Sequence, residues 1–104
     1  MDAPAVMPPD VEQERQQRIG EMASELGPAW TEQYKPGSFG CHELLDRTSL
    51  AADTVEQYIL SHPACLQNAQ WYALAEQAAA ALRELYQRVG GEHMISDDAP
   101  APPE

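Results

Sequence analysis

The sequence predicts an all-α fold built on an antiparallel helical hairpin, with helices near residues 40–61 and 69–89 and an N-terminal helix near residues 10–26. In both hairpin segments apolar residues recur every three or four positions, which is the spacing of one buried helix face. Six or seven residues join the two segments, and so short a connection favours helices that fold back on each other.

The N-terminal helix has recognisable start and stop residues. Asp10 is a good N-cap, Gly27 suits the position just beyond the helix, and Pro28 prevents continuation. These features predict a helix with a narrow apolar stripe, made of Val11, Ile19, Met22, Ala23 and Leu26.

The first hairpin helix has a wider apolar face. Ser38 or Gly40 opens it, and Pro63 then falls in the first turn of a short helical segment, His62 to Gln67, where proline is tolerated. We expect the buried face of this helix to comprise Cys41, Leu44, Leu45, Thr48, Ala51, Ala52, Val55, Tyr58 and Ile59.

The second hairpin helix repeats the pattern. Asn68 can cap its start, and the pair Gly90 and Gly91 is expected to end it. Its expected buried face comprises Trp71, Leu74, Ala75, Ala78, Ala81, Leu82, Leu85 and Val89.

The chain is expected to hold one helical domain over residues 10–91. Residues 1–9 and 92–104 contain six of the nine prolines and few side chains that could pack, so we expect a disordered start and a disordered acidic tail. At about 25 cal/mol per Å², a core of alanines and a few leucines hardly offsets the entropy of ordering the domain. We therefore expect a homo-oligomer.

Charge and apolar content exclude several classes of function. With 17 acidic and 6 basic residues the net charge is −11, which excludes nucleic-acid polymers as direct partners because phosphates must be neutralised by Lys and Arg. No apolar run suits a secretory signal or a membrane span, so we expect a cytoplasmic protein without membrane contact. The predicted helix between Cys41 and Cys65 holds them about 30 Å apart, too far for a disulfide.

The segment Gly40-Cys41-His42-Glu43 is the densest cluster of reactive side chains. A cysteine in the first turn of a helix can become a nucleophile, but Cys41 shares the apolar face, which favours a buried thiol. His42 and Asp46 are spaced to hold a metal or orient an imidazole, although a solvated face is the favoured interpretation. No zinc, phosphate or dinucleotide motif is present, so we expect no metal, cofactor or catalytic residue.

The loop from Gly27 to Gly40 places three aromatic residues beside the chain's one lysine, in a segment without net charge. Such a group can stack on a base and bind a phosphate, can anchor a protein interface, or can simply cap the hairpin core. A pocket formed with two or three residues of the following helix is a hypothesis. The candidate binding residues are Trp30, Tyr34, Lys35, Phe39, His42, Asp46 and Arg47.

Residues 38–90 carry the pattern SFGCHE-x-LDR, then HPA, then an alanine-rich helix ending in LYQRVG. With these motifs the chain resembles a group of small uncharacterised helical proteins of proteobacteria and their phages. The resemblance implies a bacterial or phage origin and an all-helical fold, and it implies no activity. In size and hairpin plan alone, the chain is also similar to phage sponge proteins that oligomerise and sequester cyclic-nucleotide immune signals.

These observations favour a non-enzymatic, acidic, helical binding protein, such as a phage or mobile-element inhibitor of host defence that occupies a host protein surface. One alternative is an oligomeric sponge that sequesters a small anionic ligand of nucleotide type through the aromatic loop. A second alternative is a small enzyme that uses Cys41, or His42 with Asp46.

Overall fold

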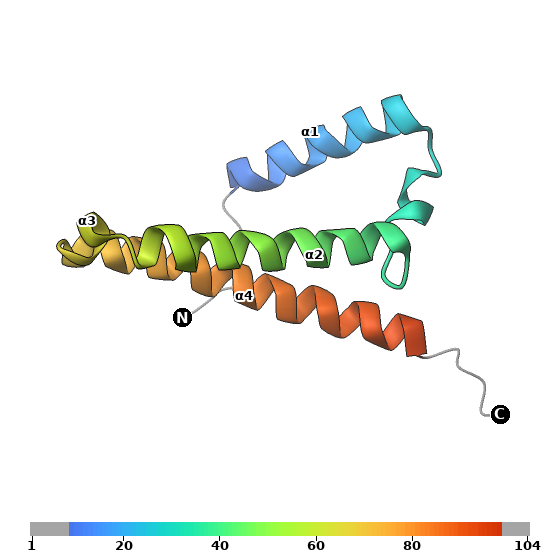
Figure 1. Ribbon diagram of the computed structural model, residues 1–104. Coiled ribbons are helices and arrows are strands. Elements are labelled where there is room, and N and C mark those ends of the chain that lie inside the picture. Colours follow the sequence, from blue (N-terminus) through green and yellow to red (C-terminus); the bar gives the residue numbers. More distant parts are fainter. Residues whose placement is uncertain (1–8, 99–104) are drawn as a thin grey trace. The chain divides into compact units, whose positions relative to one another are not determined.

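The computed structural model describes residues 9–98, whose regular elements are all helical (Figure 1), and this confirms the all-α class. The predicted terminal segments, residues 1–9 and 92–104, fall largely outside this range. The chain divides into two compact units between Glu32 and Gln33, and each is described by itself. Among the described residues, no helix combines the length and apolar character needed to cross a bilayer.

The first unit contains α1, Pro9–Leu26, and the start of a 3-10 helix, η1, Trp30–Gln33. As predicted, α1 ends just before Gly27, whose φ of 96° is a conformation that glycine adopts without strain and whose N–H donates to the Ala23 carbonyl at 2.9 Å. The polar side of the helix is stabilised by pairs within it. Glu12 accepts hydrogen bonds from the Arg15 guanidinium, at 2.9 Å, and from Gln16, at 2.7 Å.

The second unit is a hairpin of α2, Phe39–Thr54, continued by a π-helical turn, η2, Val55–Leu60, and of α4, Ala69–Asp98. The short helix α3, Pro63–Leu66, lies in the connection. As residue numbers rise along α2 and η2, the residues that they meet on α4 fall in number, so the two helices are antiparallel. This order is visible in three contacts, His42 with His93, Leu45 with Gly90, and Glu56 with Arg83.

The predicted caps of the hairpin are present. The Ser38 hydroxyl accepts from the Cys41 N–H at 3.1 Å and so begins α2, while the Asn68 side chain accepts from the N–H groups of Gln70 and Trp71 and begins α4. His62 caps α3 through Nδ1, which accepts from the Ala64 N–H at 3.0 Å. Each cap satisfies backbone donors that a helix start leaves without a partner.

A seam of small residues joins α2 to α4. Cys41, Leu45, Thr48 and Ala52 are buried at alternating spacings of four and three, and Ala79 of α4 is fully enclosed. This spacing keeps one face turned to a neighbouring helix, and small side chains let the two backbones approach closely. Because none of the large side chains in residues 10–94 is fully buried, the core is a narrow seam.

The predicted buried faces were too wide. Six large residues assigned to them are between 42% and 68% exposed. A two-helix contact buries only one stripe of each helix, so the apolar residues one step around the helix stay outside. The exposed residues are Leu44, Tyr58, Ile59, Trp71, Leu74 and Leu85.

The prediction that Gly90 and Gly91 end the second hairpin helix is also wrong, because α4 continues to Asp98. Residues 92–98 of the predicted tail are therefore helical. A glycine weakens a helix by about 1 kcal/mol relative to alanine, a cost that tertiary contacts can offset. Here Leu45 packs over Gly90, and His93 accepts a hydrogen bond at Nδ1 from the Gly37 N–H at 2.9 Å.

We predict that Ala79→Leu destabilises the hairpin by about 1–3 kcal/mol, because the seam has no room for three added carbons. The matched control is Ala80→Leu, at an exposed position of the same helix, where a change within about 0.5 kcal/mol is expected. Urea denaturation followed by circular dichroism measures both. Equal urea midpoints for the two variants would contradict the close packing of Ala79 between the helices.

A second prediction concerns Glu12, whose pKa the hydrogen bonds from Arg15 and Gln16 lower from 4.5 to about 2. Since its pKa is lowered by folding, the stabilisation of α1 is complete above about pH 4.5 and is lost as the pH falls towards 2. NMR titration of the Glu12 carboxyl should show this midpoint, and Arg15→Ala should move it back towards the ordinary value. Identical titration midpoints of Glu12 in the wild type and in Arg15→Ala would contradict the interaction between Glu12 and Arg15.

Candidate functional site

The residues predicted to form a binding pocket fall into both units. Trp30 lies in η1 in the first unit, and the other six lie in the second. Phe39 begins α2 with 83% of its surface exposed. Arg47 pairs with Glu43 at 3.1 Å, and His42 takes different partners. The joint pocket stays a prediction.

His42 and His93 form a small imidazole cluster at the open end of the hairpin, which is the end away from α3. Its Nε2 lies 3.7 Å from the Asp46 carboxylate, and its ring centroid lies 5.7 Å from that of His93. The Nδ1 atom of His93 accepts from the Gly37 N–H, which leaves the proton of the neutral ring on Nε2. Within residues 9–98 no three His, Cys, Asp or Glu side chains are grouped to hold a metal ion.

Both cysteines are buried free thiols. Cys41 is 7% exposed and lies in the seam between α2 and α4, as expected for a small buried side chain. Gly40 beside it leaves room for the Tyr34 ring and the Gln33 carbonyl, both of which a side chain at position 40 would strike. This packing places the thiol inside the hairpin.

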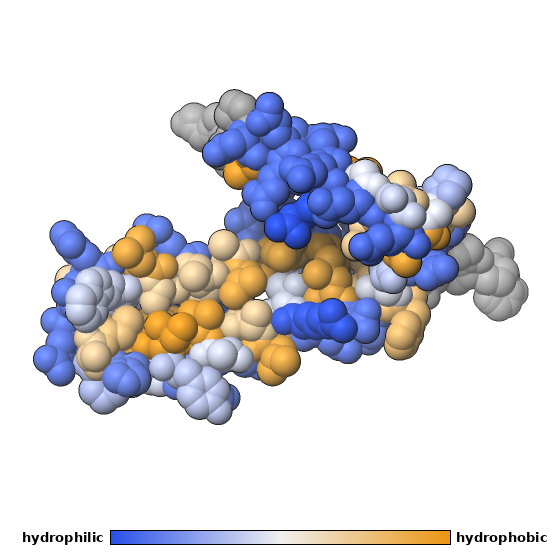
Figure 2. All heavy atoms as spheres, turned by 90° about the horizontal axis from the view of Figure 1, so that it is seen from above, coloured by the Kyte–Doolittle hydropathy of each residue, from blue (hydrophilic) through white to orange (hydrophobic). Residues whose placement is uncertain are grey.

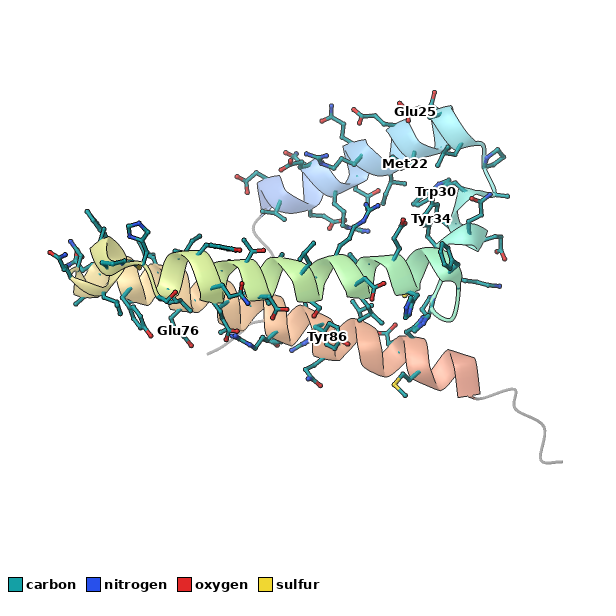
Figure 3. The ribbon with its side chains drawn as sticks, in the orientation of Figure 1. Met22, Glu25, Trp30, Tyr34, Glu76 and Tyr86 are labelled. Carbon is teal, nitrogen blue, oxygen red and sulfur yellow. The ribbon has the colours of Figure 1, made fainter. Side chains whose placement is uncertain are left out.

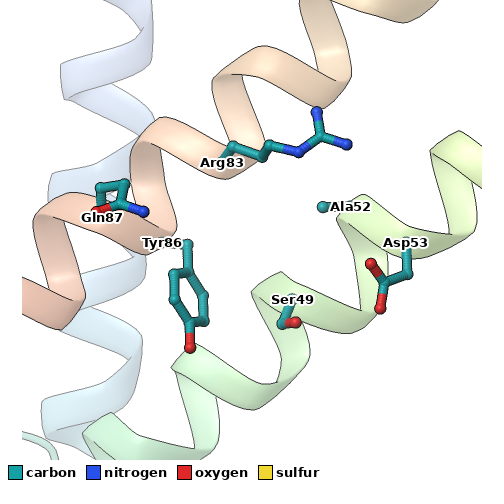
Figure 4. A pocket seen from close by; sticks show the side chains of 6 residues that line it. All are labelled: Ser49, Ala52, Asp53, Arg83, Tyr86 and Gln87. Carbon is teal, nitrogen blue, oxygen red and sulfur yellow. The ribbon is translucent and has the colours of Figure 1, made fainter.

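A polar groove runs between α2 and α4, with a volume of about 190 Å³ (Figure 4). Tyr86 reaches from α4 towards α2 beside Ser49, and the Asp53 carboxylate points into the space between the helices. The guanidinium of Arg83 is held by an ion pair with Glu56. The lining of the polar groove comprises Ser49, Ala52, Asp53, Arg83, Tyr86 and Gln87.

Negative charge continues along this side of the hairpin. Asp46 and Asp53 are seven residues apart on α2, which places them on one stripe, and both are exposed. Glu76 lies further along α4 towards α3 (Figure 3), seven residues before Arg83 and therefore on the side of that helix that lines the groove. The groove and these three carboxylates make up the acidic side of the hairpin.

The opposite side of the hairpin is apolar. On α2, Leu44 and Ala51 are seven residues apart, roughly 90° around the helix from the seam and away from Ser49 and Asp53. Tyr58 of η2 lines a hollow together with Trp71 of α4. Apolar residues gather at the surface towards the α3 end of the hairpin (Figure 2). We call the side of the hairpin opposite the polar groove the apolar face, and it comprises Leu44, Ala51, Tyr58, Trp71, Leu74, Ala78, Ala81 and Leu85.

Each end of the apolar face is hollowed. At the open end a hollow of about 220 Å³ lies between Tyr34, Cys41 and Leu44 on one side and Arg88, Val89 and Glu92 of α4 on the other. At the turn end a hollow of about 360 Å³ is lined by Tyr58, Ile59, His62, Cys65 and Trp71. Since each hollow takes residues from both helices, the two apolar stripes share one face.

The polar groove could not be predicted from the sequence. None of its lining residues is among the candidate binding residues that the sequence predicts. The sequence does contain a signal for the groove, because two pairs of polar residues are spaced four apart and so share a helix face. The pairs are Ser49 with Asp53 and Arg83 with Gln87. Matching one pair to the other requires the register between α2 and α4, which spacing along a single helix does not contain.

Compared with known proteins, the chain matches no family model, no curated protein and no solved structure.

We predict that neither Cys41 nor Cys65 reacts rapidly with a thiol reagent in the native protein, because reaction requires an exposed thiolate. Colour release from an aromatic disulfide reagent should be slow in buffer and should reach two thiols per chain in denaturant. Rapid release of one thiol without denaturant, lost in Cys41→Ala, would instead support a nucleophilic cysteine.

Proposed function

We propose that this protein is a non-enzymatic binding protein whose acidic side occupies a basic surface of another protein. The observation that carries the proposal is the polar groove, in which the Asp53 carboxylate borders an open space between two helices. Such a space suits a guanidinium or ammonium group from a partner, because a carboxylate and neighbouring hydroxyls can accept its hydrogen bonds.

The charges around the groove support a cationic partner group. Arg83 is the basic residue of the lining, and its charge is balanced by Glu56. Ser49 and Tyr86 supply neutral hydroxyl acceptors beside Asp53. Asp46 and Glu76 extend the negative potential beyond the groove, which accelerates association with a basic surface.

We propose a host protein as the partner, on the expectation from the sequence motifs that the chain resembles proteobacterial and phage proteins. A basic surface of this kind is typical of proteins that bind nucleic acids. An acidic helical protein that covers such a surface competes with the nucleic acid for it. The cell interior is the proposed location, since the partner is a host protein.

A non-enzymatic role is supported by the position of the reactive side chains. The Cys41 thiol lies in the seam, whereas His42 points to Asp46 and His93, so the two do not form a nucleophile and base pair. The sponge hypothesis rests on the aromatic loop, whose residues belong to both units. The polar groove lies within the second unit and therefore carries the proposal on its own.

The test uses the full chain and a labelled helical peptide with arginines on one face, with a glutamine counterpart as the reference probe. Fluorescence anisotropy should show binding of the arginine peptide that weakens as salt shortens the Debye length from about 30 Å at 0.01 M to about 8 Å at 0.15 M. Binding that is equal for both peptides, or insensitive to salt, would contradict the proposal.

Asp53→Asn should weaken binding of the arginine peptide by about threefold to tenfold, because it removes the carboxylate at the groove. The matched control is Glu84→Gln, which removes one negative charge from an exposed pair with Arg88 on α4. This control should change affinity by less than about twofold. Equal losses in the two variants would show that net charge, and not the groove, attracts the peptide.

A further inference from the structure

The apolar face is large for a surface left open to solvent. Its five large side chains, those of Leu44, Tyr58, Trp71, Leu74 and Leu85, are 45%, 68%, 58%, 64% and 42% exposed. Side chains of this size leave on the order of 500 Å² of apolar area in water. A standard interface uses about 800 Å² per partner, so this face with its two hollows approaches what one copy of a stable dimer contributes.

Charge is nearly absent from the middle of this face. Between Trp71 and Leu85 the apolar face of α4 contains Leu74, Ala78 and Ala81, and Ala51 lies opposite on α2. Small side chains in the middle of a helical face let another helix approach closely, while large ones at the ends fill the space at its edges. The remainder of the chain carries the net charge of −11, which opposes association of two copies.

We infer that a second copy of this chain docks on the apolar face, with the Trp71 indole of each copy in the open-end hollow of the other. Val89 is part of the lining of the open-end hollow. On α4, Trp71 lies nine residues before position 80, and Val89 lies nine residues after it. A two-fold axis at this level therefore places each of them about 13 Å from the axis, on opposite sides. Ala78 and Ala81 then lie at the axis, where the helices are closest.

The hollow matches the size of an indole. Its volume is about 220 Å³, and its lining includes the rings and alkyl groups of Tyr34, Leu44 and Val89. An apolar cavity of about 150 Å³ is already large enough to bind benzene. The result is an isologous pair of hairpins, in which four long helices share a core and each α4 runs antiparallel to the α4 of the other copy.

This inference is independent of the proposed function, because the polar groove lies on the other side of the hairpin. The two respond oppositely to salt. Screening weakens attraction between the acidic side and a basic partner, but it strengthens a dimer of two chains with net negative charge. Measuring peptide binding and dimer formation over a range of salt concentrations therefore shows which of the two proposals fails.

Sedimentation of the full chain over a range of concentrations tests the pairing. We expect a monomer–dimer equilibrium that shifts to dimer as salt rises. Trp71→Ala should weaken the dimer by more than about tenfold, as expected for loss of a buried aromatic anchor. Ala78→Glu should do the same by placing two carboxylates at the axis. The control Ala80→Glu, outside the apolar face, should leave the equilibrium within about threefold of the wild type.

Circular dichroism confirms that each variant keeps its helical content, and Ala78→Glu tests the interface if Trp71→Ala does not fold. A monomer at every concentration and salt condition would overturn the inference, as would equal losses in Ala78→Glu and Ala80→Glu. A photo-crosslinking residue at position 71 tests the register. It should join two copies and attach near Tyr34, Leu44 or Val89, whereas attachment to α1 of the same chain or to residue 71 of the other copy would overturn it.

Discussion

The close packing of α2 against α4 through small side chains is the constraint on which the other features depend. Ala79 is fully enclosed, and three of the four buried residues of α2, Cys41, Thr48 and Ala52, have small side chains, while the fourth is Leu45. Helices packed this closely bury one stripe each and leave the adjacent stripes in solvent. The seam therefore sets the polar groove on one side of the hairpin and the apolar face on the other.

The helices and their caps could be predicted because their signals are local. Ser38 and Asn68 cap the helices that follow them, and Gly27 ends α1, since each acts through backbone groups within a few residues. The end of α4 could not be predicted in this way. His93 and the Leu45 contact hold the helix beyond Gly90, and both interactions join segments far apart in sequence.

The candidate site was less predictable than the fold. Periodicity identified wide apolar faces but could not divide each into a seam and an exposed stripe, because Leu44 and Leu45 are both leucines one step apart. The division depends on which stripe meets the other helix. The expectation of self-association came from the small core, and the structure adds the face on which we infer that a second copy docks.

The central claim is that the α2–α4 seam is too narrow to hold the hairpin at full stability without a partner on the apolar face. Hydrogen exchange measured at several protein concentrations tests it most directly. Protection of the amides in Cys41–Ala52 and Ala75–Val89 should increase with concentration, because association stabilises the folded hairpin by mass action. Strong protection that does not change from dilute to concentrated protein would contradict the account.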